Sequence, residues 1–596
     1  MKRRLSLRGF SLLLLLLFII HSLSAYELQT IEMITSEEEL FELYDNLELS
    51  EHLYQEYRYL FDHPLELSTA SLDELLILPL MTHEAALAIL HLRDQGRLTD
   101  PQQLVEVLGP EMYTAVRPLV KVTLAHLRAW QVQERFYLTD DFEDDEPAYL
   151  SNRLRAGWGN HVYFGLRDVT EERVRAFDSR AGQLYAHEPL YRDTCKSAYL
   201  GLERFGILKK LVLGSYTMRW GRGVTVNSAR RRTGEGLFYY DGTSERNQGI
   251  AASFALGPNV SPALFYSSRW RSHSVSSYLD GKKASRTLPE VYLETIWGGH
   301  LELASSTGRR LGLTHYGEQV KPRLDLRLPG FIETSRLMGT GLDLEYSYNE
   351  VVFGGEHTWL DNGETAYYLD LALKDRLHSL YASVRHYPQD YLNPLGYGFA
   401  SADGEPNASD ESGWYLELKN KLAEAYTLQT SFDQWQHPSS LISDREISTS
   451  LQAKPLPRLS ATLKYRAKDN DVLKNGSRYY YSSLKPQITL HKHLKLILYY
   501  QLREDYNTRE ELDLDDNYYA QLKLALPRNT KLTNRLKYNR SNRLSETPTL
   551  SREFYTQLET QLPANLSLLL KATSTTKLLP LKDDKLKYKI QIDYTL

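Results

Sequence analysis

The sequence predicts a mainly β protein: a large antiparallel transmembrane β-barrel of about 24 strands, with a margin of at least about two, preceded by a small all-α domain. The final strand, KLKYKIQIDYTL, alternates strictly between polar and apolar residues. Runs with this period of two recur through most of the chain. Short turns alternate with long polar segments, and this asymmetry is typical of the two sides of an outer-membrane barrel.

Residues 1–25 are predicted to be a secretory signal peptide. A basic start is followed by an apolar run from Phe10 to Ile20 and by small residues up to Ala25. A short signal-anchor is the alternative interpretation. No later apolar stretch reaches the roughly 18 residues of a membrane-spanning helix. The chain has a single cysteine, Cys195, so it has no internal disulfide, which suits an exported protein of a Gram-negative envelope.

Composition supports a barrel whose strands are apolar on one face. The chain contains 42 Tyr against 17 Phe, and its mean hydropathy is −0.45. Tyrosine enrichment fits aromatic girdles at two membrane interfaces. A soluble β-rich protein that binds carbohydrate would also be rich in tyrosine. The soluble alternatives, a large sandwich or a propeller, lack support because we find no repeat of blade length.

Three regions precede or form the barrel. Residues 26–63 read as an acidic helical segment, 64–123 as a compact helical module, and 128–596 as the barrel. In the module, one helix is expected to begin near Ser71 and to end at Pro79. A second is expected from about His83 to Gln95, followed by Gly96. A third is expected at Gln102–Val107, then a turn at Leu108-Gly109-Pro110 and a helix to Val120.

The module resembles the tandem helix-hairpin-helix domain of competence-type DNA-binding proteins. The matching stretches are STASLDELLILP, AILHLRDQGRL and RPLV. In members that bind DNA, the resemblance implies hairpins of the form Gly-hydrophobic-Gly, whose backbone N–H groups approach phosphate.

The hairpins of this chain depart from that pattern. The first is Leu80-Met81-Thr82 and the second is Leu108-Gly109-Pro110, which keeps one glycine. Residues 64–123 contain eight acids and four bases, a net charge of −4, whereas phosphate binding requires a basic face. Docking of a periplasmic protein or a structural role is therefore favoured, with DNA binding as the alternative.

The whole chain also resembles a group of Gram-negative envelope proteins in which a glycine-poor module of this kind precedes a large barrel. The stretches that carry this resemblance are FGILKKLVLGSYTMRWGRGVTVNS, NQGIAASFALG and GGHLEL. It implies the architecture and no established activity.

The barrel register is read from its turns. Placing the C-terminus and the short turns in the periplasm requires a first strand near Arg128–Leu138. The short turns are expected at Gly206–Lys209, Gly257–Asn259, Asn349-Glu350, Lys374–Arg376, Leu422–Glu424, Pro455–Arg458, His491–His493, Pro527–Thr530 and Pro563–Asn565. The longer segments are Val169–Thr194, Gly221–Gln248, Gly317–Gly339 and Tyr387–Ser412.

Two clusters of basic residues are candidate sites. The first lies in WGRGVTVNSARRRTGEG and comprises Arg219, Arg222, Arg230, Arg231 and Arg232. Its glycines suggest a loop folded close to other backbone. The functional interpretation is an anion-binding constriction or lid. The alternative is a charged lumen wall or outer loop paired with acids.

The second cluster is a basic lumen in the C-terminal quarter. Residues 451–596 contain 26 bases and 15 acids, a net charge of +11, in a chain of net charge −5. If the apolar residues of each strand face lipid, the bases between them face inward, which favours an anionic substrate. The alternative is that they neutralise acids on the opposite wall or on a plug. The candidate residues are Lys464, Arg466, Lys495, Arg503, Lys523, Lys531, Arg535, Lys537, Lys585, Lys587 and Lys589.

No HExxH or GxSxG motif is present, and no nucleophile has an evident base, so we expect no enzyme, cofactor or metal site. The predicted protein lies in the outer membrane of a Gram-negative bacterium, in contact with its lipid, with the N-terminal domain in the periplasm. Its predicted role is transport, assembly or passage of a substrate. The alternatives are DNA binding or uptake through the helical module, and a structural or adhesive outer-membrane protein.

Overall fold

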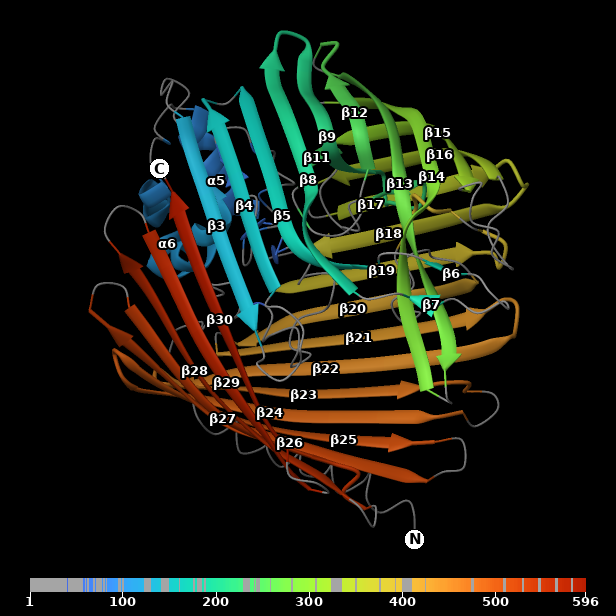
Figure 1. The fold of residues 1–596 in the computed structure, drawn as a ribbon. Coiled ribbons are helices and arrows are strands. Elements are labelled where there is room, and N and C mark those ends of the chain that lie inside the picture. Colours follow the sequence, from blue (N-terminus) through green and yellow to red (C-terminus); the bar gives the residue numbers. More distant parts are fainter. Residues whose placement is uncertain are drawn as a thin grey trace.

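The chain forms a closed barrel of 24 antiparallel strands, seen obliquely in Figure 1. The computed structural model describes residues 130–595 apart from gaps in the loops, the longest being 141–148, 229–235, 323–334 and 399–409. It also describes 83–94, 98 and 101–122, with scattered residues between 40 and 81. The predicted signal peptide and most of the acidic segment 26–63 lie outside the described residues.

Each barrel strand pairs with its neighbours in sequence. The strands are β3 (Trp130–Asp140), β4 (Tyr149–Trp158), β5 (Val162–Val174), β8 (Pro189–Phe205), β9 (Leu208–Trp220), β12 (Asn247–Phe254), β13 (Val260–Leu279), β14 (Lys282–Ser305), β15 (Arg309–Pro322), β16 (Ser335–Tyr348), β17 (Val351–Leu360), β18 (Thr365–Lys374), β19 (His378–Tyr387), β20 (Glu411–Ala423), β21 (Tyr426–His437), β22 (Ile442–Leu456), β23 (Leu459–Asp469), β24 (Arg478–His491), β25 (Leu494–Tyr506), β26 (Leu512–Leu526), β27 (Thr530–Ser541), β28 (Thr549–Leu562), β29 (Leu566–Leu579) and β30 (Asp583–Thr595).

The first and last barrel strands close the ring. β3 pairs antiparallel with β30, from Gln133 opposite Thr595 to Asp140 opposite Tyr588. The short strands between β5 and β12 are not members of the ring. β10 (Val226–Asn227) and β11 (Gly236–Tyr239) pair with β9, and β6 (Phe177–Asp178) pairs with β7 (Tyr185–Ala186). Closure joins the first barrel strand to the last, so neither is an edge strand, as a sheet that spans lipid requires.

Side chains alternate between an apolar exterior and a polar interior. On β16, Leu342 and Leu344 are each 39% exposed, whereas the intervening Asp343 is 3% exposed. Because a closed barrel offers burial only inside, the buried residues face the lumen. Large exposed apolar residues occur on most strands, and this set includes Phe136, Leu150, Phe164, Leu200, Leu213, Ile250, Leu264, Leu301, Leu313, Leu342, Phe353, Leu369, Val384, Leu418, Tyr465, Leu484, Leu498, Leu522, Leu536, Phe554, Leu570 and Leu586.

The two ends of the barrel differ. We call the end that carries the turns before β9, β13 and β25 the short-turn end, and the opposite end the long-loop end. The chain ends at the short-turn end, because Thr595 is opposite Gln133 near the start of β3. Exposed tryptophans lie near both ends, Trp130 and Trp158 at the short-turn end and Trp359 and Trp414 at the other. This distribution matches the aromatic girdles of membrane barrels.

The described helices precede the first barrel strand in sequence. The described elements are α5 (His83–Asp94), η1 (Pro101–Gln103), α6 (Leu104–Val116), η2 (Arg117–Leu119) and a parallel pair of β1 (Leu65–Glu66) with β2 (Val120–Lys121). They share an apolar core that includes Leu75, Ile89 and Leu104. Residues 123–129 join this module to β3 and span at most about 28 Å, so it is tethered at the short-turn end.

Gly109 interrupts α6 with φ 74°, a left-handed conformation. This glycine lies in the predicted turn Leu108-Gly109-Pro110, and a Cβ added there meets no atom within 4 Å. Of the first predicted hairpin only Met81 is described, and it is buried. Within the described part of the chain, no helix is long and apolar enough to cross a membrane.

The predicted barrel class and strand number are confirmed. The first strand, predicted near Arg128–Leu138, is described as Trp130–Asp140, which agrees within two residues. The predicted long segments are shorter at two places, since β15 continues to Pro322 and β5 continues to Val174.

Candidate functional site inside the barrel

β9 leaves the barrel wall half-way along its length. It pairs with β8 from Phe205 opposite Leu208 to Tyr199 opposite Gly214. At Gly214 the backbone takes φ 104°, and an added Cβ would lie 2.2 Å from the carbonyl oxygen of Ala198. The next six residues, 215–220, are all buried. A wall strand alternates, so continuous burial means that this part of β9 is covered on both faces.

The chain beyond β9 docks on the inner face of the wall at β16–β18. The backbone N–H groups of Val224 and Thr225 donate to the two carboxylate oxygens of Glu356, at 2.9 and 2.7 Å. The hydroxyls of Thr225 and Thr358 are 2.7 Å apart. Glu356 and Thr358 belong to β17, so the loop after β9 is fixed to a strand far along the sheet.

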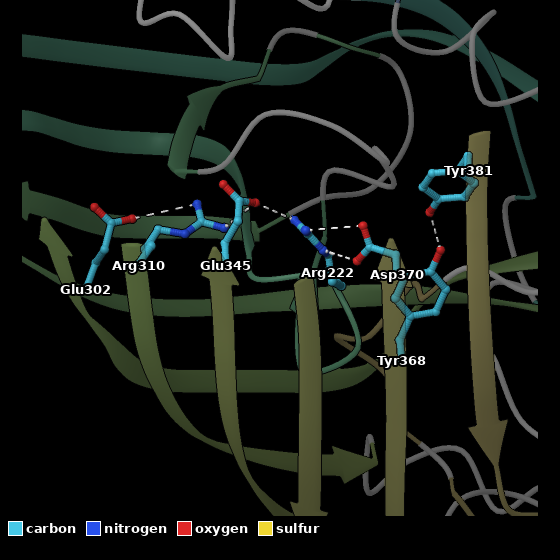
Figure 2. A network of polar contacts seen from close by, with 7 residues as sticks. All are labelled: Arg222, Glu302, Arg310, Glu345, Tyr368, Asp370 and Tyr381. Atoms are coloured by element: carbon cyan, nitrogen blue, oxygen red, sulfur yellow. Dashed lines mark hydrogen bonds and ion pairs between the residues drawn. The ribbon is translucent and has the colours of Figure 1, made fainter. Parts of the chain in front are cut away.

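Arg222 is the charged clamp of this contact (Figure 2). Its Nε lies 2.5 Å from Oδ1 of Asp370 on β18, and its Nη1 lies 2.8 Å from Oε2 of Glu345 on β16. Arg310 lies 3.3 Å from the same Glu345 oxygen and 4.0 Å from Glu302. The row of alternating charges crosses β14 to β18, so acids on the wall neutralise an arginine supplied by the loop.

The loop between β19 and β20 holds the loop after β9 in place through side-chain hydrogen bonds. The side chain of Asn393 donates to the carbonyl oxygens of Val224 and Thr225, at 2.8 and 3.0 Å. Its Oδ1 accepts from the Tyr316 hydroxyl at 2.6 Å. Tyr391 donates to Val224 O at 3.0 Å. Burial raises the pKa of the Tyr391 phenol, so it stays protonated and remains a donor.

Backbone pairing joins the two loops directly. Asn227 N donates to Leu395 O at 2.6 Å, and Tyr397 N donates to Gly223 O at 2.9 Å. We call residues 215–228 and 388–398 together the partition. Its buried polar groups at these contacts are paired, as buried backbone requires.

Apolar side chains fill the space behind the partition. The cluster joins residues of β8 to β15 with Leu395 and includes Tyr216, Trp220, Val226, Phe265 and Tyr316. Trp220 stacks on Phe265 and on His300, with ring centroids 5.4 and 5.1 Å apart. This side of the lumen is therefore packed like a protein core.

The packed region extends to β19–β21. Arg385 is fully buried, forms an ion pair with Glu411, and places Nη2 2.9 Å from Oδ1 of Asp433. A buried arginine between two acids is held by charge-assisted hydrogen bonds.

On the wall of β22–β30, two inward arginines near the long-loop end reach solvent, whereas the inward tyrosines at mid-strand, Tyr499, Tyr519 and Tyr555, are buried. Arg466 pairs with Glu446 at 2.7 Å while its side chain stays 33% exposed. Arg503 pairs with Asp505 at 2.7 Å and is 46% exposed. The Arg385 side chain is 0% exposed. Both exposed arginines face inward, because the alternate residues Tyr465 and Leu498 lie outside.

The residues of the predicted basic lumen lie on this wall, and several of them are set against rings or acids of neighbouring strands, whereas Lys495 is opposite another lysine. Arg535 lies 4.3 Å from the ring centroid of Tyr555 and 3.4 Å from Glu553. Lys589 lies 5.0 Å from the ring centroid of Tyr137. Register pairs Lys495 with Lys523, Lys537 with Glu553, and Lys531 with Glu559. Lys464, Lys585 and Lys587 alternate with the exposed Tyr465 and Leu586, so they also face inward.

The predicted arginine cluster is only partly described. Arg219 is buried in the partition strand and Arg222 is clamped between acids. Arg230, Arg231 and Arg232 lie outside the described residues, as do Leu80 and Thr82 of the helical module. The two interpretations of this cluster are an anion-binding loop and a charged segment paired with acids. Arg222 is paired with wall acids.

Sequence reasoning missed the wall acids that receive the partition, Glu345, Glu356 and Asp370, and it missed Asn393 within the partition. Their signal was present in part, because inward acids recur on β16, β17 and β18 at positions that register aligns. Asp343 is opposite Glu356. Among the residues that the structure describes, no group of three or more His, Cys, Asp or Glu side chains could hold a metal ion.

Comparison with known proteins finds similarity only to solved structures, at low sequence identity. No protein-family model matches the sequence, and no curated protein matches it. Solved structures similar in shape include the P pilus usher translocation pore (PapC), at 9% identity and TM-score 0.37, covering 78% of this chain and 99% of the usher. A mutant of the ferric enterobactin receptor PfeA from Pseudomonas aeruginosa matches at 10% identity and TM-score 0.42, covering 80% and 81%. The copper transporter OprC matches at 9% and 0.42, covering 78% and 81%. At these scores the similarities carry no functional argument.

Proposed function

We propose that the protein is an outer-membrane barrel of a Gram-negative bacterium that lets a substrate cross the membrane. The observation that carries the proposal is the contrast between the two faces of the closed wall. Its exterior presents large apolar side chains on most strands, and its interior presents charged side chains that reach solvent at Arg466 and Arg503. A wall of this kind suits a barrel that has lipid on its outside and water on its inside.

The charge of the open wall favours an anionic substrate. Residues 451–596 carry a net charge of +11. Several bases are already neutralised by neighbours, such as Arg466 by Glu446 and Arg535 by Glu553. The excess of bases over acids in this quarter still sets the sign of the potential that a passing solute meets.

The helical module is proposed to dock a periplasmic partner. It is tethered at the short-turn end, which is the periplasmic end in this orientation, and the alternative is DNA binding. Its net charge of −4 in residues 64–123 opposes contact with phosphate. Gly109 supplies one left-handed hairpin residue, whereas the first hairpin contains no glycine.

A planar-bilayer recording of the purified full chain tests the transport proposal. We expect ion conductance with anion selectivity, which is lost in the triple variant Lys585→Glu, Lys587→Glu and Lys589→Glu. A control triple, Lys209→Glu, Lys321→Glu and Lys492→Glu, makes the same charge change at exposed positions and should leave selectivity unaltered. Cation selectivity of the unmodified protein would contradict the anionic substrate.

A structural or adhesive barrel is the second candidate, and the packed side of the lumen is the observation that favours it. If the whole lumen is closed, no conductance is expected at any voltage, while the heat-modifiable migration of a folded barrel persists. Recovery of the mature protein in the soluble fraction without detergent would end both membrane proposals.

A further inference from the structure

We propose that the partition, residues 215–228 and 388–398, is a permanent division of the lumen, and that solute crosses only along the wall of β22–β30. This inference rests on the proposed transport function and adds the route. It identifies the specificity-determining surface as one side of the barrel.

The contacts of the partition make it a fixed part of the barrel. Arg222 engages Asp370 with two nitrogens, at 2.5 and 3.3 Å, and Glu345 with a third. Glu356 accepts from two backbone N–H groups. Moving the loop away would remove the partners of Asp370 and Glu356 and would leave Glu345 with Arg310 alone, so an outward swing during each passage is strongly disfavoured.

The wall is shaped to receive the partition. A Cβ added at Gly354 would lie 1.7 Å from Nη2 of Arg222, and one added at Gly341 would lie 1.8 Å from Oγ1 of Thr225. Both glycines occupy inward positions on neighbouring strands, β17 and β16. Because any side chain there would meet the loop, the two strands form a built seat.

The far side of the partition is sealed by apolar contact. Val226 and Leu395 belong to the same buried cluster as Tyr216, Phe265 and Ile296. Water and ions are excluded from such packing. A hydrated solute therefore finds no route between the partition and β8–β15.

The remaining wall carries inward charges that reach solvent toward the long-loop end, above the buried mid-strand side chains of Tyr499, Tyr519 and Tyr555. Inward arginines at Arg466 and Arg503 remain a third or more exposed. Arg535, Lys571 and Lys589 lie over tyrosine rings, at 4.3 to 5.0 Å from the centroids. Rings that support the aliphatic stems hold the charged ends along the wall. A solute recognised here carries several negative charges along its length.

Cysteine accessibility tests the route. In a Cys195→Ser background of the full chain, single cysteines replace Thr462 and Thr573 on the open wall, or Thr217 and Ser267 on the packed side. Thr462 and Thr573 are partly exposed, and Thr217 and Ser267 are buried. A methanethiosulfonate reagent is added during planar-bilayer recording. We expect stepwise block at the first pair and unchanged current at the second.

Block at Thr217→Cys or Ser267→Cys would overturn the partition. If the unmodified protein carries no current, the transport proposal fails. The partition is then tested separately, by the rate at which the reagent labels each cysteine of the folded protein in detergent. Modification at least about tenfold faster at the open wall supports it, and equal rates overturn it. Adding Asn393→Ala to the Ser267→Cys variant should make the cysteine at position 267 accessible to the reagent, because the hydrogen bonds of Asn393 that join the two loops are lost.

Discussion

Arg222 and Asp370 form an ion pair inside the barrel, with Nε and Oδ1 2.5 Å apart although the two residues are 148 positions apart in sequence. Arg222 belongs to the loop after β9, and Asp370 belongs to β18. Glu345 completes the clamp from β16. The pair therefore links one arc of the wall to another, and it predicts where the barrel is most sensitive to substitution.

Removing this arginine should destabilise the folded barrel strongly. Arg222→Met leaves the buried Asp370 without its cation and leaves Glu345 with Arg310 alone, and we expect a loss of about 3–5 kcal/mol of unfolding free energy. Urea titration followed by heat-modifiable migration measures it. Arg336→Met, at an exposed arginine of β16, is the control and should stay within about 0.5 kcal/mol. Equal effects of the two variants would show that the clamp is unimportant.

Asn393 should be needed for its hydrogen bonds rather than its size. Asn393→Asp keeps the acceptor for Tyr316 and loses the donors to Val224 and Thr225. Because those carbonyls are buried, we expect a loss of about 2–3 kcal/mol and easier proteolysis within the first loop. Asn259→Asp, in the exposed turn between β12 and β13, is the control. Unchanged protease resistance of the Asn393 variant would contradict the role of these hydrogen bonds.

The seat of the partition predicts a steric effect. Gly354→Ala places a methyl group 1.7 Å from Arg222 Nη2, so the clamp must move, and we expect a loss of about 1–3 kcal/mol. Gly157→Ala is the control, because its Cβ would lie 3.6 Å from the Tyr163 ring, an ordinary contact. Thermal midpoints from heat-modifiable migration compare the two. A stable Gly354 variant with normal protease resistance would mean that the loop has another seat.

The wall could be predicted from sequence because every strand repeats one local pattern. Leu586, Tyr588 and Ile590 alternate with Lys585, Lys587 and Lys589, and the alternation alone assigns the two faces. The short turns were found for the same reason, since Pro or Gly interrupts the pattern at Pro563 and Gly257.

The partition could not be predicted in the same way. Residues 215–220 are buried on both faces, so no period of two marks which side is the lumen. The glycines of WGRG indicated a loop close to other backbone, but the partners Glu356 and Asp370 lie more than a hundred residues further on. A hydrogen bond such as Asn393 to Val224 depends on the closed ring, and a single sequence contains no local sign of it.

The exterior of the barrel gives the last prediction. Leu342 projects from the middle of β16 and is 39% exposed, which places it on the face proposed to meet lipid. Leu342→Arg should therefore cost about 2–4 kcal/mol in a bilayer, because the guanidinium lies near the membrane midplane. The measurement is urea unfolding in liposomes. Thr573→Arg introduces the same side chain on the open lumen wall and should cost less than about 1 kcal/mol. If the two variants are equally stable, the exterior does not face lipid, and the outer-membrane proposal is wrong.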